Sequence, residues 1–128
     1  MILIDTSVWV DLLRGSGRGP ELAEMLRSKV HLASTEPILM ELLAGTRNDI
    51  EYTSVRRLGT SVTWIPLDPA SDFESAAQIY AHCRRNGITP RGLIDTLIAA
   101  IALRTGCALM TSDRDFTAME TLVPLELV

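Results

Sequence analysis

Short apolar segments alternate with longer segments of helical periodicity along the whole chain, and this alternation restricts the fold more than any other feature. Alternating strands and helices predict a parallel sheet that helices cover on both faces. We therefore expect an α/β fold of three layers, α/β/α, with a central, mostly parallel sheet of four or five strands. Strands are predicted at residues 2–5, 30–34, 62–65 and 108–111, with a weaker candidate at 123–127.

Proline and glycine residues mark the ends of the predicted helices. Pro20 and Pro37 suit the first turn of a helix, and Gly87 suits the left-handed residue that follows a last turn. Asp68 is placed to cap a long helix that begins at Pro69. The predicted helices span residues 7–14, 20–28, 37–44, 49–58, 69–86 and 93–105.

The length and composition of the chain suit one compact domain that spans residues 1–128. Hydrophobic residues make up 47% of the 128, which is enough to bury a core. The widest break, at residues 15–20, is too short to separate two domains. The most apolar stretch, residues 93–103, contains Asp95 and is shorter than the roughly 20 residues of a membrane span. Met1 leads directly into the first strand, which leaves no room for a signal peptide, so we expect a soluble, cytoplasmic protein.

The residues that most often bind zinc or form redox sites show no suitable spacing. Cys83 and Cys107 fit no metal-ligand or redox pattern, and we expect both to be small buried side chains, with a disulfide as the alternative. His31 and His82 are isolated in the sequence and are not expected to bind a metal ion.

Three acidic residues, Asp5, Glu41 and Asp95, interrupt apolar segments. Acidic side chains are seldom buried unless they are paired or bind a metal ion. Each has a purely structural alternative to test. Asp5 ends the first strand and could cap the following helix, and Asp95 could pair with Arg91 four residues earlier. No arginine lies at helical spacing from Glu41.

Two further acids, Asp113 and Asp115, follow the predicted strand 108–111. Ligands of such folds bind at the carboxyl ends of the strands, so Asp5 and Asp113 are expected at the same edge of the sheet. Asp113 comes first after the strand and is the preferred ligand. Asp115 is either an additional ligand or the cap of a short helix near Phe116.

A divalent cation accounts for acids gathered at one edge. Two carboxylates about 5 Å apart repel by roughly 3 kcal/mol at an effective dielectric constant near 20, so a cluster needs either protons or a cation. Ligand sets made only of oxygen select Mg²⁺ or Mn²⁺ over zinc. We therefore expect the metal ligands to be Asp5, Glu41, Asp95 and Asp113.

The net charge of −4 argues weakly against binding to nucleic acid. The excess of acidic residues disappears, however, when the acids of the expected metal site are not counted. Apart from Asp5, Glu41, Asp95, Asp113 and Asp115, the chain holds 11 acidic residues against 12 basic ones. Of those basic residues 11 are arginine, the side chain best matched to phosphate, although a genome rich in arginine codons explains the count equally well.

Four segments in order resemble the PIN-domain nucleases, and among them the bacterial toxins of the VapC type. The first is IDTSVW at residues 4–9, and the second is ILMELLAG at 38–45. ITP at 88–90 leads to LIDTLIAA at 93–100, and LMTSDRDF follows at 109–116. Each segment alone is weak, but the four at these spacings match essentially the whole chain. The chain departs from similar toxins at Gly92, where they often carry serine, which removes a helix cap but no ligand.

The resemblance implies that Asp5, Glu41, Asp95 and Asp113 form an acidic quartet. It implies that Thr6 and Thr111 orient the carboxylates or the substrate, and that Asp115 is a possible fifth acid. It also implies Mg²⁺-dependent cleavage of RNA, a homodimer, and a small antitoxin whose tail blocks the acidic pocket. An apolar groove for that tail is expected on two helices, with contributions from Trp9, Leu12, Leu13, Tyr52, Val55 and Leu58.

The expected reaction is hydrolysis of an RNA phosphodiester bond by a water molecule that the metal ion activates. Products with a 5′-phosphate and a 3′-hydroxyl are expected, since no residue is placed to activate a ribose 2′-hydroxyl. Asp5, Asp95 and Asp113 would contact the ion directly or through water, while Glu41 would hold an outer water or a second ion. The candidates for contact with the RNA backbone are Arg14, Arg84, Arg85 and Arg91.

Three other functions are compatible with a chain of this length and predicted architecture. A phosphoacceptor receiver domain needs a lysine after its last core strand, and the only lysine here is Lys29. An aspartyl phosphatase needs a second acid two residues after Asp5, where this chain has Ser7. A non-catalytic PIN-like module that binds RNA or protein is the main alternative, and unused buried acids would cost it stability.

Overall fold

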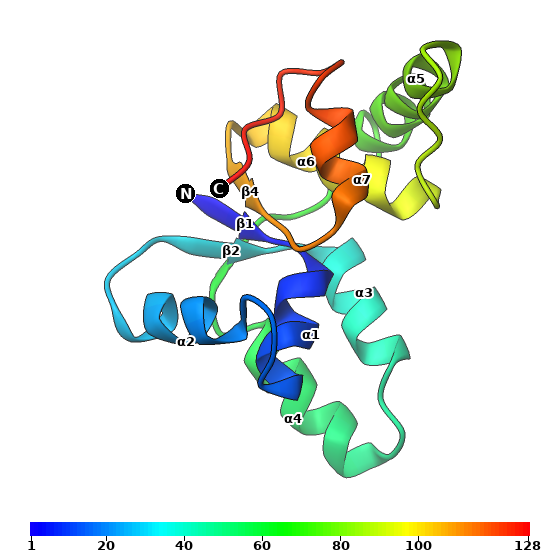
Figure 1. The fold of residues 1–128 in the computed structure, drawn as a ribbon. Helices are drawn as coiled ribbons and strands as arrows, with labels where there is room; N and C mark the ends of the chain where they lie inside the picture. The colour runs from blue at the N-terminus through cyan, green and yellow to red at the C-terminus, as the bar shows by residue number, and fades with distance from the viewer.

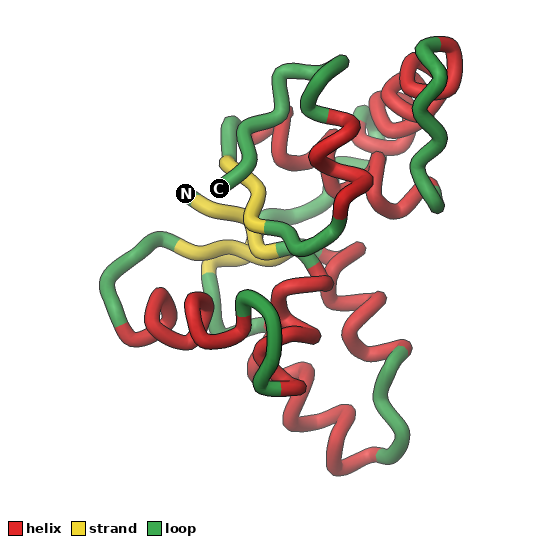
Figure 2. The backbone as a smooth tube through the Cα atoms, viewed as in Figure 1, coloured by secondary structure: helices red, strands yellow, loops and turns green.

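The computed structural model describes residues 1–128, and a four-stranded parallel sheet lies at its centre (Figure 1, Figure 2). The strand order is β3-β2-β1-β4, and every neighbouring pair is parallel. In β1, Ile2 pairs with Leu32 and Ile4 pairs with Met110. The strands are β1 (Ile2–Ile4), β2 (Leu32–Ser34), β3 (Thr63–Trp64) and β4 (Ala108–Met110).

Helices cover both faces of the sheet and complete the three-layer α/β/α arrangement that the sequence predicts. Helices α1 to α4 lie on one side of the sheet, and α5, α6 and α7 lie on the other (Figure 1). Their bounds are α1 (Thr6–Arg14), α2 (Gly19–Arg27), α3 (Glu36–Ala44), α4 (Asp49–Gly59), α5 (Asp72–Arg85), α6 (Leu93–Thr105) and α7 (Arg114–Met119).

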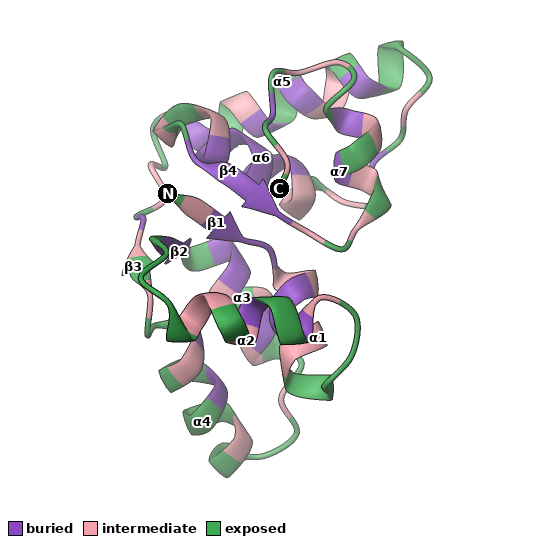
Figure 3. Ribbon diagram, turned by 60° about the vertical axis from the view of Figure 1, so that its left-hand side comes forward, coloured by how far each residue is buried: buried purple, intermediate pink, exposed green.

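The two helical layers bury most of β1 and all of β4, which explains why these two strands are continuously apolar, whereas the edge strand β3 stays partly exposed. Leu3, Ile4 and Leu109 are fully buried, and every residue of α6 from 96 to 102 is buried (Figure 3). The apolar run of β1 ends at Asp5, and the buried run of α6 begins directly after Asp95. Both acids therefore lie at the rim of the core.

The predicted fifth strand is wrong. Residues 123–127 contribute one isolated parallel bridge, between Leu109 and Leu127. The amide of Leu125 donates to the carbonyl of Val123 at 2.7 Å, which closes a three-residue turn that an extended strand cannot contain. Pro124, inside that turn, has no amide hydrogen to offer a neighbouring strand.

Helix α5 begins at Asp72 and not at Pro69. The Asp68 carboxylate accepts hydrogen bonds from the amide of Ala70 and the hydroxyl of Ser71, so it closes a turn over residues 68–71. The left-handed end of this helix is confirmed, since Gly87 has a φ of 78°.

An ion pair between the buried Asp72 and Arg104, whose side chain is 34% exposed, fastens α5 to α6. The Asp72 carboxylate accepts hydrogen bonds from Arg104 Nε at 2.8 Å and Nη2 at 2.9 Å. Burial raises the pKa of Asp72, but the hydrogen bonds from Arg104 and from the Asp68 amide outweigh it and hold the pKa below its ordinary value. The pair thus fixes the position of the helix that carries Asp95.

Two expectations from composition can also be compared with the structure. Cys83 and Cys107 are both buried and free, as predicted. None of the helices combines the length and apolar composition that crossing a membrane requires.

Candidate metal centre

Asp5 lies directly after the central strand β1 and is almost completely buried. Its Oδ2 accepts hydrogen bonds from Ser7 Oγ at 2.6 Å and Thr111 Oγ1 at 2.9 Å. It also accepts a longer bond from the Ser7 amide at 3.4 Å, which makes it the N-cap of α1. Burial raises the pKa of Asp5, and these hydrogen bonds offset part of the rise. Asp5 therefore does cap α1, as the structural alternative expected. Even so, burial disfavours the charged form of its carboxylate.

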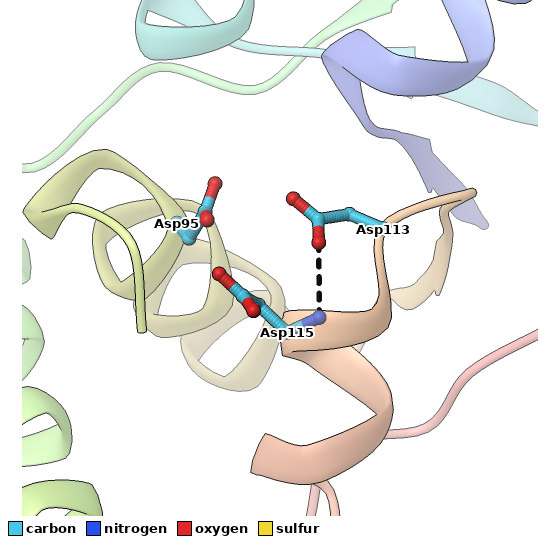
Figure 4. A group of neighbouring side chains, drawn as sticks. All are labelled: Asp95, Asp113 and Asp115. Carbon is cyan, nitrogen blue, oxygen red and sulfur yellow. Dashed lines mark hydrogen bonds between the residues drawn. The ribbon is translucent and has the colours of Figure 1, made fainter. Parts of the chain in front are cut away.

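Three further carboxylates converge beside the sheet edge (Figure 4). Asp95 comes from the first turn of α6, while Asp113 and Asp115 come from the start of α7. Each contributes an oxygen, and the three oxygens lie within 4.8 Å of one another. Asp113 Oδ1 accepts a hydrogen bond from the Asp115 amide at 2.9 Å and so caps α7. This cap fixes the backbone that carries two of the three acids.

Glu41 points toward the same acids from α3. Its Oε1 accepts a hydrogen bond from Thr6 Oγ1 at 2.8 Å. Burial raises the pKa of Glu41, and the negative charges of Asp5 and Asp113 raise it further against the opposing effect of the Thr6 bond. Glu41 and the three converging aspartates therefore belong to one electrostatic neighbourhood.

Asp95 experiences that neighbourhood most strongly. Burial and the charges of Asp113, Asp5, Glu41 and Asp115, in that order, raise its pKa to about 7. No protein group donates a hydrogen bond to the Asp95 carboxylate to offset this. At neutral pH, the Asp95 carboxylate is therefore partly protonated unless a cation binds beside it.

Arg91 is the cation that the chain itself supplies. Its Nη2 lies 2.8 Å from Asp113 Oδ1, and its Nε lies 3.4 Å from Asp115 Oδ2. The Arg91 amide also donates to Asp115 Oδ2 at 2.9 Å. The Arg91 side chain remains 76% exposed, so water screens these pairs and each is weak.

Comparison with known proteins identifies the family. A family model described as "PIN domain" matches residues 2–122. The chain belongs to the PIN domain family. Among curated proteins, this PIN domain is 39% identical over 129 residues to the ribonuclease VapC11 of Mycobacterium tuberculosis, and the match covers 98% of this chain and 96% of that protein.

Solved structures show the same fold. The VapBC2 structure from Rickettsia felis, bound to a promoter DNA fragment, matches this PIN domain with a TM-score of 0.77 and 19% identity, over 100% of this chain and 98% of that one. VapBC-5 from Mycobacterium tuberculosis, a member of the VapBC family of toxin-antitoxin systems, matches with a TM-score of 0.67 and 18% identity, over 98% and 95%. At these identities the likeness supports the fold alone.

The four predicted metal ligands do not all lie in the close group of carboxylates. Asp95 and Asp113 lie in the close group together with Asp115, whereas Asp5 and Glu41 adjoin that group and influence it through their charges. Thr6 and Thr111, expected to orient carboxylates, donate to two of these acids, Glu41 and Asp5.

The structure excludes two structural alternatives that the sequence left open. Asp115 does not cap the short helix α7, because Asp113 precedes the helix and occupies the N-cap position. Arg91 does not pair with Asp95. It precedes α6, outside the helical spacing that the pairing assumed, and it faces α7 instead. As expected, Gly92 provides no side-chain cap for α6.

The remaining arginine candidates lie outside the carboxylate group. Arg14, Arg84 and Arg85 are exposed, and none forms an ion pair with its acids. Sequence reasoning missed Asp11, Arg18 and Ser112, which hold the segment between β4 and α7. The glycine-rich residues 15–19 were the one available signal, since such a stretch lets backbone approach another chain segment closely.

The donor set of this PIN domain suits a hard divalent cation. All the converging groups are carboxylates, and no histidine or cysteine belongs to the group. Oxygen-only sites favour Mg²⁺ and Mn²⁺, whereas zinc sites usually contain nitrogen or sulfur ligands. A raised pKa at Asp95 is the expected property of a carboxylate whose site is completed by positive charge.

The stability of the metal-free protein should depend on pH, because folding places Asp95 among other carboxylates. Because the pKa of Asp95 is about 7 in the folded protein and near 3.8 ordinarily, folding retains a proton, and stability falls as pH rises between these values. Asp95→Asn removes this loss. Both proteins are melted in EDTA at a series of pH values. We expect the difference between the melting temperature of Asp95→Asn and that of the unsubstituted protein to increase by roughly 5 °C from pH 5 to pH 8.

The matched control is Asp49→Asn, which changes an exposed aspartate in the first turn of α4. Its melting temperature relative to the unsubstituted protein should not change over this pH range. A difference for Asp95→Asn that stays constant from pH 5 to pH 8 would show that the cluster imposes no strain on Asp95.

Proposed function

We propose that this protein is a Mg²⁺-dependent endoribonuclease, a single PIN domain over residues 1–128 that acts as the toxin of a toxin–antitoxin pair and inhibits translation and growth. The observation that carries the proposal is the convergence of Asp95, Asp113 and Asp115 beside Asp5 and Glu41 at the carboxyl edge of the sheet. The 39% identity to ribonuclease VapC11, over almost the full length of both proteins, supports the choice of RNA as substrate. A cytoplasmic location, where cellular RNA lies, stays a prediction.

Asp95 and Asp113 are the proposed inner ligands of Mg²⁺, for which Mn²⁺ can substitute. Asp115 can join them, because its carboxylate already lies within the same group. Asp5 and Glu41 complete the negative field from the β1 and α3 sides, directly or through water. When bound, the ion supplies the charge that polarises the phosphodiester and lowers the pKa of an attacking water.

The protein's own residues prepare the site for this chemistry. The hydroxyls of Ser7 and Thr111 hold Asp5 Oδ2, and the hydroxyl of Thr6 holds Glu41. These donors fix the carboxylates before a ligand arrives, and fixed groups lose little free energy to reorganisation during a reaction. We expect cleavage to leave a 5′-phosphate and a 3′-hydroxyl, because the proposed nucleophile is a water molecule and not a ribose 2′-hydroxyl.

Arg91 is the best placed of the proposed RNA contacts. Its guanidinium lies against Asp113 and Asp115 and is largely exposed, so an RNA phosphate near the site can compete for it. Arg14, at the end of α1, and Arg84 and Arg85, at the end of α5, are exposed and stay further candidates. Contacts of this kind set the register of an RNA backbone and carry little sequence information.

Cleavage of RNA tests the proposal directly. Purified protein incubated with total cellular RNA and Mg²⁺ or Mn²⁺ should yield discrete fragments that EDTA suppresses. Asp95→Asn should lower the rate at least about 100-fold, because loss of an outer partner of a ligand alone typically costs 10–100-fold. Gel analysis and sequencing of fragment ends measure the rate and identify the cut.

Asp49→Asn, on the exposed first turn of α4, should cleave at the normal rate. Undiminished cleavage in EDTA or by Asp95→Asn would refute the metal mechanism. A folded protein that binds Mn²⁺ but cleaves no RNA would favour the alternative of a non-catalytic PIN-like module that binds RNA or protein.

A groove between α1, α3 and α4 is the proposed docking site for the antitoxin. It encloses about 510 Å³, and Glu41 lies in its wall beside Val10, Leu13 and Arg14. The lining combines apolar residues with charged ones such as Arg47 and Glu51, and Glu41 joins the groove to the carboxylate cluster. The expected composition was partly wrong, since Trp9 is fully buried in the core and only Leu13 and Tyr52 of the six predicted residues are well exposed.

Leu13 provides the test, because its side chain is exposed and lines the groove. Leu13→Glu should weaken binding of the cognate antitoxin at least about tenfold, since it replaces an exposed apolar side chain with a charge. Calorimetric titration measures the affinity, and RNA cleavage by the variant should persist.

Val30→Glu is the control, because Val30 is exposed on the loop before β2, outside this groove. Equal loss of affinity in both variants, or none in Leu13→Glu, would exclude the groove. We propose further that the protein forms a homodimer, which light scattering of the free protein tests.

A further inference from the structure

Three side chains outside the carboxylate cluster tie the loop between α1 and α2 to the segment between β4 and α7. Asp11 Oδ2 accepts hydrogen bonds from Ser112 Oγ at 2.7 Å and from the Arg18 amide at 3.0 Å. Arg18 Nη1 donates to the carbonyl oxygens of Thr111 at 3.0 Å and Val128 at 2.6 Å. Two consecutive residues, Thr111 and Ser112, are thus held from outside by what we name the Asp11–Arg18–Ser112 clamp.

The other side of the same segment faces the proposed metal site. Thr111 Oγ1 donates to Asp5 Oδ2 and accepts a hydrogen bond from the Asp113 amide at 2.9 Å. The Ser112 amide donates at 2.9 Å to Ser7 Oγ, which itself donates to Asp5. The clamp therefore acts on the two residues that join Asp5 to Asp113.

The α1–α2 loop has a backbone that only glycine allows. Gly17 has a φ of 49°, and a Cβ there would collide with the Asp11 carboxylate. A Cβ at Gly19 would lie 2.6 Å from the Asp11 carbonyl oxygen, which is backbone and cannot turn aside. Both glycines let the loop lie directly on Asp11, and this contact delivers the Arg18 amide to the carboxylate.

The direction of the Arg18 side chain is also fixed. Glu21 accepts hydrogen bonds from Arg18 Nε at 2.9 Å and Nη2 at 3.0 Å, a bidentate pair that leaves Nη1 for the Thr111 carbonyl. The Arg18 side chain is 28% exposed, so it is packed along most of its length. Arg18 is therefore oriented from both ends of its guanidinium.

We propose that Asp11, Arg18 and Ser112 are positioning residues that hold Asp113 in the geometry needed to bind the divalent cation. This inference rests on the proposed function, because it assigns the clamp to that metal site. None of the three touches the carboxylate group itself. Groups that orient a metal ligand from outside the ligand set typically change metal affinity or activity by 10–100-fold.

The affinity for Mn²⁺ alone, measured by calorimetry without RNA, tests the clamp. Ser112→Ala and Arg18→Gln should each weaken Mn²⁺ binding about tenfold, while the metal-free protein still melts cooperatively. Arg27→Gln is the matched control, since Arg27 ends α2, the helix that Arg18 precedes, is exposed, and pairs only with exposed Glu24. Its Mn²⁺ affinity should equal that of the unsubstituted protein.

A pair of substitutions at Asp11 separates geometry from charge. Asp11→Ala removes the acceptor of both hydrogen bonds and should weaken Mn²⁺ binding at least as much as Ser112→Ala. Asp11→Asn keeps an oxygen that can accept both bonds, so its Mn²⁺ affinity should lie close to that of the unsubstituted protein. Equal losses in Asp11→Ala and Asp11→Asn would show a long-range effect of charge and overturn the clamp.

Amide hydrogen exchange, followed by NMR in EDTA, tests the clamp without metal or RNA. Loss of one hydrogen bond in Ser112→Ala should speed exchange about fivefold at the amides of Asp113 and Asp115, with no change in Arg27→Gln. Unchanged exchange, or Mn²⁺ affinity equal to that of the unsubstituted protein, would overturn the proposal. If the unsubstituted protein bound no Mn²⁺, the proposed function would fail, and exchange would still decide whether the clamp holds the segment.

Discussion

Repulsion among carboxylates gathered at one edge of a parallel sheet is the interaction on which the rest of the site depends. Asp95, Asp113 and Asp115 lie within a few ångströms of one another, with Asp5 and Glu41 beside them, and burial together with these negative charges raises the pKa of Asp95 to about 7. Such a cluster is unfavourable unless positive charge enters it. The chain supplies part of that charge through Arg91, which is exposed and therefore easily displaced. A divalent cation would neutralise the cluster more completely than one exposed guanidinium, and this is the charge that the proposed function requires.

The fold produces this proximity through topology. β1 and β4 are parallel neighbours, so Asp5 and the segment after Met110 emerge at the same edge. The buried helix α6, fastened to α5 by Asp72 and Arg104, brings Asp95 to that edge. Hydroxyl groups and the α1–α2 loop then fix the acids locally. The acids thus come from four separate elements, and the hydroxyl groups of Ser7, Thr111 and Thr6 orient two of them, Asp5 and Glu41.

Much of the fold could be predicted because its signals are local. Apolar runs, prolines at helix starts and glycines at helix ends depend on nearby residues, and they gave the strands and most helices correctly. The turn at Asp68 and the loss of a fifth strand around Pro124 could not be predicted, since each depends on hydrogen bonds that compete with the regular pattern. The acids were visible because charge is unusual in apolar segments. The partners of Arg91 and the roles of Asp11 and Arg18 were not, because exposed charged residues are common and only tertiary contacts distinguish these.

Anomalous diffraction from crystals grown with Mn²⁺ tests the central claim most directly. The account predicts a single strong peak, or two close peaks, within about 2.3 Å of carboxylate oxygens of Asp95 and Asp113, with the Arg91 guanidinium moved away from Asp113. A fully ordered site with no peak at these carboxylates, or a peak at acids elsewhere on the surface, would contradict it, because the cluster would then be stable without the cation on which the proposed function depends.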